Sequence, residues 1–511
     1  MTSVFDAGPA APCPAPFNLA AHVLAHARDL GDKPALEVLS PDRSEIWSYD
    51  QLERAVRGIA TGLLQRGLKP RDKILMRMGN TVDFPLSYLG AIAAGMVPVP
   101  TSSQLTAPEV AKMITALDPA AILFSNGIAV PENSGCTEIG QAELDAMHAL
   151  PPADYEMGDP ERLAYIIYTS GTSGQPRAVC HAHRAIWARQ MMHAGWSGLR
   201  ISDRLLHAGA FNWTFTLGTG LMDPWSIGAT ALIPEDGTAP EALPALLRKH
   251  KATIFAAVPG VYRKILSHPN IPDLPDLRHG LAAGENLPET LRRAWQAATG
   301  GQIYEAFGMS ECSTFISSSP TTPAENGMIG RPQIGRRVAL IDPETGEIVP
   351  HGSAGTIAIH RSDPGLMLGY LGAEDETNSK YIDDWFITGD QAVMDQSGGI
   401  SYLGRDDDMM NAGGFRVSPL EVEAALLPHP DIREIGATDI RVKEGTSVIM
   451  AFYTSDTPID EAALKDYAAA RLARYKQPRA YIRMPKLPSN PNGKLSRRAL
   501  KESHEAHLRR T

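Results

Sequence analysis

Cysteine is scarce in this chain of 511 residues. The four cysteines lie far apart and none belongs to a CxxC pair: they are Cys13, Cys136, Cys180 and Cys312. This spacing argues against a disulfide framework and against a cysteine-based zinc site. We therefore expect four reduced thiols.

Positive charge is also in short supply. The chain has 48 Lys and Arg residues against 58 Asp and Glu residues, which gives a formal net charge of −10. Because the basic residues are spread along the chain, this balance argues against a nucleic-acid-binding surface. A local cationic site for an anionic cofactor remains compatible with it.

Long hydrophobic runs are missing. The most apolar stretch, residues 88–100, has about half the length of a membrane-spanning helix and contains two glycines and two prolines. The first sixteen residues contain no Lys or Arg, unlike a secretory signal. We expect no membrane insertion and a cytoplasmic location. The composition, 43% hydrophobic and 21% charged, is typical of a globular protein with roughly three or four domain-sized cores.

Strand-like and helix-like segments alternate through the first part of the chain, which predicts two doubly wound, mostly parallel sheets covered by helices. The expected strands are 45–49, 73–76, 97–99, 121–124, 163–168, 204–207, 229–233, 254–258, 281–284 and 303–307. The expected helices are 19–29, 50–65, 84–95, 107–117, 183–193 and 239–250. Residues 130–160 are expected to be a linker rich in proline and glycine.

Residues 327–403 have a different character, with many glycines and turns and with short strands expected at 337–341 and 355–360. They predict an antiparallel, barrel-like subdomain, and the last hundred residues predict a compact α+β unit. The fold class is therefore α/β. We expect a large N-terminal domain (1–404), a hinge (405–408) and a small, mobile α+β domain (409–511).

A strand at 163–168 ends in a loop of glycines, hydroxyl groups and one cation, which suits a polyphosphate. The loop residues are Thr169, Ser170, Gly171, Thr172, Ser173, Gly174 and Arg177. The glycine spacing and the absence of a following Lys exclude a Walker A loop. Taken alone, the cluster is equally consistent with a surface turn.

Five further segments follow the loop in order. They are Gly-Glu-Asn-Leu-Pro at 284–288, Phe-Gly-Met-Ser-Glu at 307–311, Thr-Gly-Asp at 388–390, Gly-Arg-Asp-Asp at 404–407 running to Gly-Phe-Arg at 414–416, and Pro-Ser-Asn-Pro-Asn-Gly-Lys at 488–494. Together with the loop, they resemble the core motifs of the adenylate-forming enzymes, which include acyl-CoA synthetases, peptide-synthetase adenylation domains and firefly luciferase. The resemblance covers nearly the whole chain.

The resemblance implies ATP, Mg²⁺ and CoA as cofactors and assigns the site residues. Lys494, Glu311 and Ser310 are implied as catalytic residues, with Glu311 also as the Mg²⁺ ligand. Cofactor binding is assigned to the loop together with Gly284, Glu285, Asn286, Glu305, Ala306, Phe307, Gly308, Asp390, Arg405, Gly414 and Arg416. Outside these motifs, a lone acid or arginine of this kind is more often a solvated surface charge.

The implied chemistry begins with attack by a carboxylate on the ATP α-phosphorus. This step brings two anions together, so a cation such as Lys494 at the point of attack lowers the barrier. No general base is required, because the ionised carboxylate is already the nucleophile. In the family a small domain then rotates so that a thiolate attacks the acyl-adenylate; Asp407 matches the hinge position, and Gly414 matches a glycine lining the thiol tunnel.

The acid-binding residues implied by motif position are aromatic and largely apolar: Phe211, Trp213, Thr214, Phe215, Ala283 and Met309. Such a set suits a monocarboxylate. Residues 217–233 are similar to the benzoate-type CoA ligases, which favours aryl or short- to medium-chain acyl acids.

The leading hypothesis is an AMP-forming carboxylic acid:CoA ligase. A stand-alone adenylation enzyme that loads a carrier protein is an alternative, and a catalytically silent adenylate-binding protein is an alternative of another class. The presence of Lys494, Glu311 and Asp390 together counts against the silent protein. Arg177 and Ser310, which replace the family's usual Lys and Thr, keep the charge and the hydroxyl. A monomer and a homodimer are both compatible with the sequence.

Overall fold

The computed structural model describes residues 2–169, 177–268, 271–325, 327–412, 415–443, 446–472, 474–489 and 494–508. The chain divides into two compact units. The larger unit contains residues 5–337 and 359–386, and the smaller unit contains residues 1–4, 338–358 and 387–511. Among the described helices, none combines the length and hydropathy that crossing a membrane requires.

A nine-stranded sheet forms the centre of the larger unit, in the order β16-β15-β14-β13-β12-β10-β11-β2-β3. Neighbouring strands from β14 to β2 are parallel, and β15, β16 and β3 add antiparallel edges. The strands are β2 (Pro34–Leu39), β3 (Ser44–Ser48), β10 (Arg204–His207), β11 (Thr230–Pro234), β12 (Ile254–Ala257), β13 (His279–Ala283), β14 (Gln302–Met309), β15 (Ser313–Ser317) and β16 (Arg331–Pro332).

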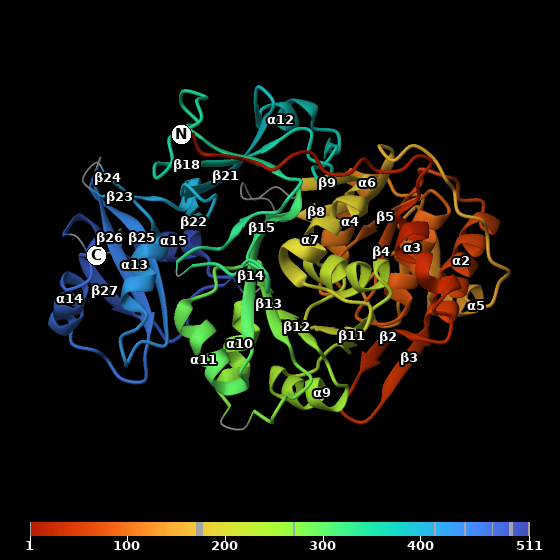
Figure 1. Cartoon of the computed structure of the whole chain (residues 1–511), viewed down its shortest axis with the longest axis horizontal. Coiled ribbons are helices and arrows are strands. Elements are labelled where there is room, and N and C mark those ends of the chain that lie inside the picture. Colours follow the sequence, from red (N-terminus) through yellow and green to blue (C-terminus); the bar gives the residue numbers. More distant parts are fainter. Residues whose placement is uncertain are drawn as a thin grey trace. The chain divides into compact units, whose positions relative to one another are not determined.

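Helices pack on this sheet through their apolar sides. α9 (Leu243–Lys249), α10 (Pro259–Leu266) and α11 (Glu289–Thr299) lie beside strands β12 to β14 (Figure 1). In α11 only Leu291 and Trp295 are buried, and they join Phe255 and Ile303 of the strands in one core cluster. The spacing of Leu291 and Trp295, four residues apart, places both on one helix face.

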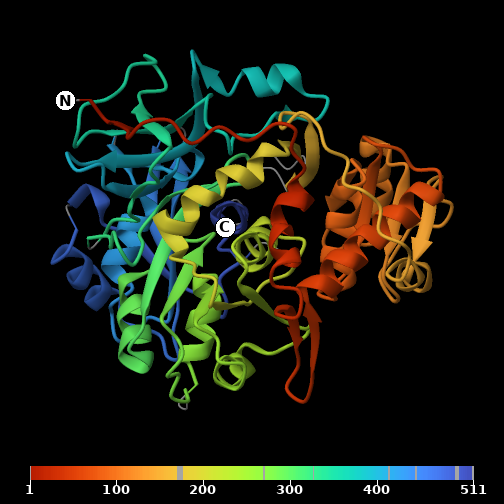
Figure 2. The same ribbon diagram turned by 45° about the vertical axis from the view of Figure 1, so that its right-hand side comes forward.

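A second, four-stranded sheet is parallel throughout, in the order β5-β4-β6-β7. Its strands are β4 (Lys73–Arg77), β5 (Val97–Pro100), β6 (Ala121–Phe124) and β7 (Thr137–Gly140). α3 (Asp83–Ala93) is buried along its whole length; it contacts β4 and β5, and α2 (Tyr49–Gln65) packs against it (Figures 1 and 2). α4 (Ala107–Leu117) completes this layer, and the two mostly parallel sheets confirm the predicted α/β fold class.

The expectation of a linker at residues 130–160 is wrong, because this stretch contains β7 and helix α5 (Gln141–Met147). α5 buries Leu144 and Met147. Its polar side reaches Asp83 at the start of α3: Gln141 Nε2 donates to Asp83 Oδ2 (2.6 Å), and His148 Nε2 lies 3.1 Å from Asp83 Oδ1. Four strand residues and seven helical residues are too few to establish a periodicity in the sequence.

Two helices expected as single elements are interrupted. Residues 19–29 form α1 (Leu19–Val23) followed by a 3₁₀ turn, η1 (Ala25–Arg28). Residues 183–193 form α6 (Arg184–Ala188) and α7 (Gln190–Met192), followed by the π-helix η2 (His193–Ser197). A second π-helix, η3 (Thr216–Met222), runs into α8 (Asp223–Ser226). The buried Arg189–Asp223 ion pair (2.7 Å) links these two irregular segments, which is a contact that a local pattern does not reveal.

A six-stranded sheet contains most of the predicted β-rich segment, in the order β1-β17-β18-β21-β20 with β22 paired to β21. Its strands are β1 (Val4–Asp6), β17 (Arg337–Ile341), β18 (Ala354–His360), β20 (Tyr381–Ile382), β21 (Trp385–Met394) and β22 (Ile400–Arg405). α12 (Glu374–Asn378) precedes β20.

The C-terminal part of the smaller unit is α+β, as expected. A three-stranded sheet, β25-β26-β27, is accompanied by the hairpin of β23 (Met410–Ala412) and β24 (Phe415–Val417). The strands are β25 (Glu434–Lys443), β26 (Thr446–Thr454) and β27 (Ala480–Arg483), and the helices are α13 (Pro419–Leu426), α14 (Glu461–Ala469) and α15 (Arg497–Leu508). Val422, Leu426, Ile449 and Leu464 form the centre of this core. The domain limits predicted at 404–409 stay a prediction.

Arg336 and Asp363 form a buried ion pair in the larger unit. The side chains of Arg336 and Asp363 are fully buried and bonded to each other. Arg336 Nη2 also donates to the carbonyl of Thr314 (3.1 Å), and the Gly365 N–H donates to Asp363 Oδ1 (2.8 Å). The guanidinium therefore joins β15 to residues 363–365.

Glu305 is a buried acid on β14. One carboxylate oxygen accepts from the Leu287 N–H (2.9 Å), and the other accepts from Arg292 Nη2 (3.2 Å). Burial raises the pKa of Glu305 to about 7, although both donors oppose the rise. This side chain, which motif position assigns to the cofactor, thus holds β14 to the turn before α11.

We predict that Arg336→Met lowers the free energy of unfolding by about 3–5 kcal/mol, because it leaves the buried Asp363 carboxylate without its cation. Arg337→Met is the matched control, since the adjacent Arg337 is 44% exposed in its pair with Asp6 and should cost below about 1 kcal/mol. Urea unfolding of both variants measures the difference. If the two variants lose the same free energy of unfolding, the buried Arg336–Asp363 pair does not contribute more to stability than the exposed Arg337–Asp6 pair.

A second prediction concerns pH. Because the pKa of Glu305 is raised in the folded state, its contribution to stability is fully present below its unfolded pKa and is lost as pH rises through about 7. Glu305→Gln keeps an acceptor for Leu287 but does not titrate. The stability of the wild type minus that of Glu305→Gln should therefore fall as pH rises from 5 to about 7.5, measured by urea unfolding. A constant difference would contradict the raised pKa.

Candidate active site

The predicted phosphate loop connects an antiparallel pair, β8 (Leu163–Thr169) and β9 (Arg177–Ala182). Thr169 and Arg177 are register partners, so the two ends of the loop lie next to each other. Ser170, Gly171, Thr172, Ser173 and Gly174, together with the Thr169 side chain, lie outside the described residues. β9 was not expected, and it places Arg177 on a strand.

Arg177 belongs to a charge cluster centred on Tyr370 of β19 (Gly369–Tyr370), the strand that pairs with β9. The Arg177 guanidinium lies over the Tyr370 ring, 5.3 Å from its centroid, and forms an ion pair with Glu376 of α12. The Tyr370 hydroxyl donates to Glu311 Oε1 (2.7 Å), and burial is the main cause of its raised pKa. Tyr370 therefore joins Arg177, the cation predicted to bind phosphate, to Glu311, the predicted Mg²⁺ ligand.

The segment around Ser310 and Glu311 is fixed by its backbone. The Met367 N–H donates to the Glu311 carbonyl (2.7 Å). His181 Nε2 donates to the Ser310 carbonyl (2.7 Å), and burial lowers the pKa of His181 to about 4, which keeps the imidazole neutral. His181, which lies outside the predicted motifs, therefore holds the backbone of the predicted catalytic residue Ser310.

Gly308 sits at a β-bulge between Phe307 and Gly308, where β14 meets β15. A β-carbon on Gly308 would lie 2.2 Å from the carbonyl oxygen of Ser313, so the backbone excludes any side chain there. The Phe307 ring contacts Phe315 edge-on, with centroids 5.5 Å apart. Phe307 is half-buried near the end of the strand.

Several residues of the predicted acid site come together at the carboxyl ends of β10, β13 and β14. Phe215, Ala283 and Ala306 belong to one apolar cluster, with Trp213 packed against it. Gly284, whose φ is +90°, brings the backbone close to the Trp213 ring. The side chains of four further predicted residues are at least partly exposed: Thr214, Glu285, Asn286 and Met309. Phe211, in contrast, packs against Phe84 of α3, with ring centroids 5.5 Å apart.

His207, which the sequence analysis missed, packs against this cluster through Phe215. Its ring lies edge-on to Phe215, with centroids 4.3 Å apart. It is 1% exposed, and neither ring nitrogen has a hydrogen-bond partner among the described residues. Burial lowers its pKa to about 3, so the imidazole is neutral. A buried polar group in an apolar setting is costly without a hydrogen-bond partner, and a water molecule or a ligand atom would satisfy it.

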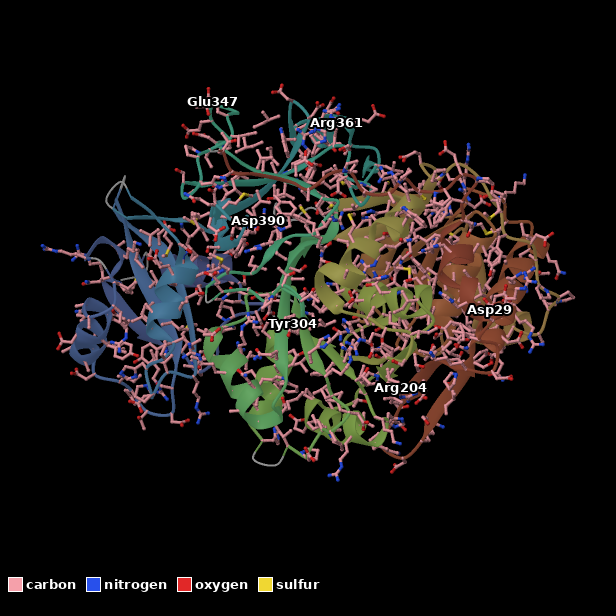
Figure 3. All side chains as sticks on the ribbon, in the orientation of Figure 1. Asp29, Arg204, Tyr304, Glu347, Arg361 and Asp390 are labelled. Carbon is pink, nitrogen blue, oxygen red and sulfur yellow. The ribbon has the colours of Figure 1, made fainter. Side chains whose placement is uncertain are left out.

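The residues predicted to hold the ribose lie in the smaller unit, on β21 and β22, where Asp390 and Arg405 are register partners. Asp390 (labelled in Figure 3) is 4% exposed. The Tyr402 hydroxyl donates to its Oδ1 (2.6 Å), and Arg405 Nη1 lies 3.3 Å from its Oδ2. Tyr402 was not predicted; it fixes the orientation of the Asp390 carboxylate.

Lys494 is half-buried and is described in the structure, whereas residues 490–493 before it are not. Asp407 lies in the 3₁₀ turn η5 (Asp406–Asp408), and Arg416 pairs with Asn411 in the β23–β24 hairpin. The side chains of Asp407 and Arg416, and the whole of Gly414, lie outside the described residues. Their predicted roles stay predictions.

Comparison with known proteins gives full-length matches. The chain is 29% identical over 490 residues to the benzoate–CoA ligase of Thauera aromatica, covering 90% of this chain and 92% of that protein. It is also 29% identical over 493 residues to the 4-hydroxybenzoate–CoA/benzoate–CoA ligase of Rhodopseudomonas palustris, covering 91% and 90% of the two chains.

Solved structures agree over the same length. The crystal structure of a benzoate CoA ligase from Burkholderia xenovorans matches with a TM-score of 0.86 at 28% identity, covering 95% of this chain and all of that one. ATP-bound MatB from Rhodopseudomonas palustris matches with a TM-score of 0.88 at 25% identity, covering 96% and 99%.

Two family models cover most of the chain. Residues 23–371 match the AMP-binding enzyme model, and residues 421–494 match the model of the AMP-binding enzyme C-terminal domain. The predicted motifs fall within or between these ranges. The chain therefore belongs to the AMP-binding enzyme family of adenylate-forming proteins.

Proposed function

We propose that this protein is an AMP-forming acid–thiol ligase that activates an aryl monocarboxylate with ATP and transfers the acyl group to CoA. The observation that carries the proposal is the Tyr370 cluster, in which a phosphate-loop arginine and the Glu311 carboxylate share one tyrosine. The full-length similarity to benzoate–CoA ligases supports the aryl substrate class. A cytoplasmic location belongs to the same proposal.

In the first half-reaction, residues 169–177 bind the phosphates and Arg177 supplies positive charge. A single carboxylate such as Glu311 fits Mg²⁺, which proteins commonly hold through one or two carboxylates and the substrate phosphates. Mg²⁺ bound there would neutralise phosphate charge. Tyr370 occupies one oxygen of Glu311 and so fixes the direction in which the carboxylate faces.

Lys494 is proposed to stabilise the charge that develops when the substrate carboxylate attacks the ATP α-phosphorus. Asp390 is proposed to accept hydrogen bonds from the ribose hydroxyls, because Tyr402 and Arg405 hold its carboxylate in one orientation. The products of this step are an acyl-adenylate and pyrophosphate. No side chain needs to remove a proton from the acid.

In the second half-reaction, the thiolate of CoA attacks the acyl-adenylate and releases AMP. Asp407 is the proposed hinge that withdraws Lys494, and Gly414 is proposed to line the passage for the pantetheine arm, where a side chain would narrow the channel. Trp213, Phe215 and Ala283 are proposed to contact the acid. Neutral His207 offers one polar contact to an otherwise apolar substrate.

Acid-dependent ATP/PPi exchange with benzoate, hydroxybenzoates and short- and medium-chain fatty acids tests the activity. CoA-dependent AMP release with each active acid then separates the ligase from an enzyme that loads a carrier protein. If none of these acids supports ATP/PPi exchange, the result would favour a silent adenylate-binding protein. A preference for aliphatic acids would overturn the aryl assignment.

We predict that Lys494→Ala abolishes acid-dependent ATP/PPi exchange and leaves thioester formation from a supplied acyl-adenylate and CoA within about twofold, because the lysine acts only in the first step. Lys501→Ala, on α15 in an ion pair with Asp439, is the control and should leave both rates unchanged. Equal loss of both half-reactions in Lys494→Ala would contradict the proposal that Lys494 acts only in adenylation.

For Asp390→Ala we predict weaker ATP binding by about 1.5–3 kcal/mol, the value of a hydrogen bond to a charged group. This corresponds to roughly a 10- to 150-fold rise in Kd, measured by calorimetry. The control is Asp384→Ala, which removes an exposed carboxylate paired with Arg361 and should not change ATP affinity. An unchanged Kd in Asp390→Ala would exclude Asp390 from the nucleotide site.

A further inference from the structure

The segment that carries Lys494 is anchored directly after the lysine. Leu495 forms a β-bridge with Ser489, and the Ser496 N–H donates to the Pro488 carbonyl (2.9 Å). The Leu495 side chain packs closely on Gly436: a β-carbon added to Gly436 would lie 2.8 Å from Leu495 Cδ2. α15 then begins at Arg497, three residues beyond the lysine.

Arg497 is the centre of a mostly buried charge network within the smaller unit. Its Nη2 donates to both carboxylate oxygens of Glu423 on α13 (2.8 and 2.7 Å), and its Nη1 lies 3.4 Å from Asp408 Oδ2. Glu423 also accepts from the Ala437 N–H (2.8 Å). The exposed fractions of the Arg497 and Glu423 side chains are 14% and 13%.

These contacts connect two places that the proposed reaction uses. Glu423 lies on α13, whose residues Val422 and Leu426 belong to the core of the smaller unit, whereas Asp408 directly follows the proposed hinge residue Asp407. A guanidinium is planar and rigid, so contacts with two carboxylates fix the direction of the side chain and of the backbone that carries it. A lysine ammonium at the same position would keep the charge without fixing that direction.

We propose that Arg497 is a positioning residue for adenylation, which holds the Lys494 segment on α13 and ties it to Asp408 beside the hinge. This inference rests on the proposed function, because the roles of Lys494 and Asp407 come from it. Arg497 itself contacts neither substrate nor nucleotide in this assignment. Rotation at Asp407 carries the lysine with it, because Asp408, the residue after Asp407, and the lysine segment share one guanidinium.

The test compares the same substitution at two adjacent residues of α15. Arg497→Lys should lower kcat for ATP/PPi exchange roughly 10- to 100-fold, the loss expected when a reacting group is misplaced by about 1 Å. The KM for ATP and the rate of thioester formation from a supplied acyl-adenylate should stay within about twofold. Arg498→Lys is the matched control: Arg498 is 71% exposed and pairs only with Glu502 among the interactions described for it, so both rates should be unchanged.

A second variant, Asp408→Asn, removes the hinge-side charge and keeps the Glu423 pair. It should lower exchange less than Arg497→Lys does and should also spare thioester formation. Thermal unfolding of each variant monitors folding, and Asp408→Asn carries the test if Arg497→Lys does not fold. The inference is overturned if exchange in these variants equals that of Arg498→Lys, or if both half-reactions fall together. A wild type that shows no acid-dependent exchange would instead refute the proposed function.

Discussion

The hydrogen bond from Tyr370 to Glu311 sets the arrangement of charge in the larger unit. Arg177 lies over the same ring, so one side chain determines where a cation and a carboxylate stand relative to each other. The backbone supports it, because β19 pairs with β9 and the Tyr370 N–H donates to Thr377. Without this tyrosine, the proposed phosphate loop and the proposed metal ligand would be two separate features of the sheet edge.

In the smaller unit, too, carboxylates are held in place by cations and hydrogen-bond donors. Asp390 is a buried and Glu423 a mostly buried carboxylate, and each is held by an arginine and by a further hydrogen-bond donor. Burial of a charge is costly unless it is paired and hydrogen-bonded, so each of these acids requires its partners to be in place before it can be buried. The same partners fix the direction of the carboxylate. Stability and preorganisation of the site are therefore consequences of one constraint.

The sequence predicted the parallel sheets and the order of the motifs, because these depend on local patterns. β6, β10 and α4 have the predicted bounds, whereas Arg177, which was predicted in the loop, is the first residue of the unexpected strand β9. β7 and α5 were missed because they are too short to show a period. Tyr370, Tyr402 and His207 were missed for another reason, because each matters through a contact with a different element. Tyr370, for example, bonds to Glu311, which lies 59 residues before it in the sequence. No sequence spacing predicts such a contact.

The pairing of Thr169 with Arg177 has an entropic consequence. The free energy needed to close the loop is part of forming the β8–β9 sheet, so binding of phosphates does not have to bring the loop ends together. Loop-closure entropy also grows slowly with length, by about 0.6 kcal/mol for each doubling. Residues 170–176 can therefore change in number and identity, and with them the proposed affinity for phosphates, at little cost to the stability of the β8–β9 sheet.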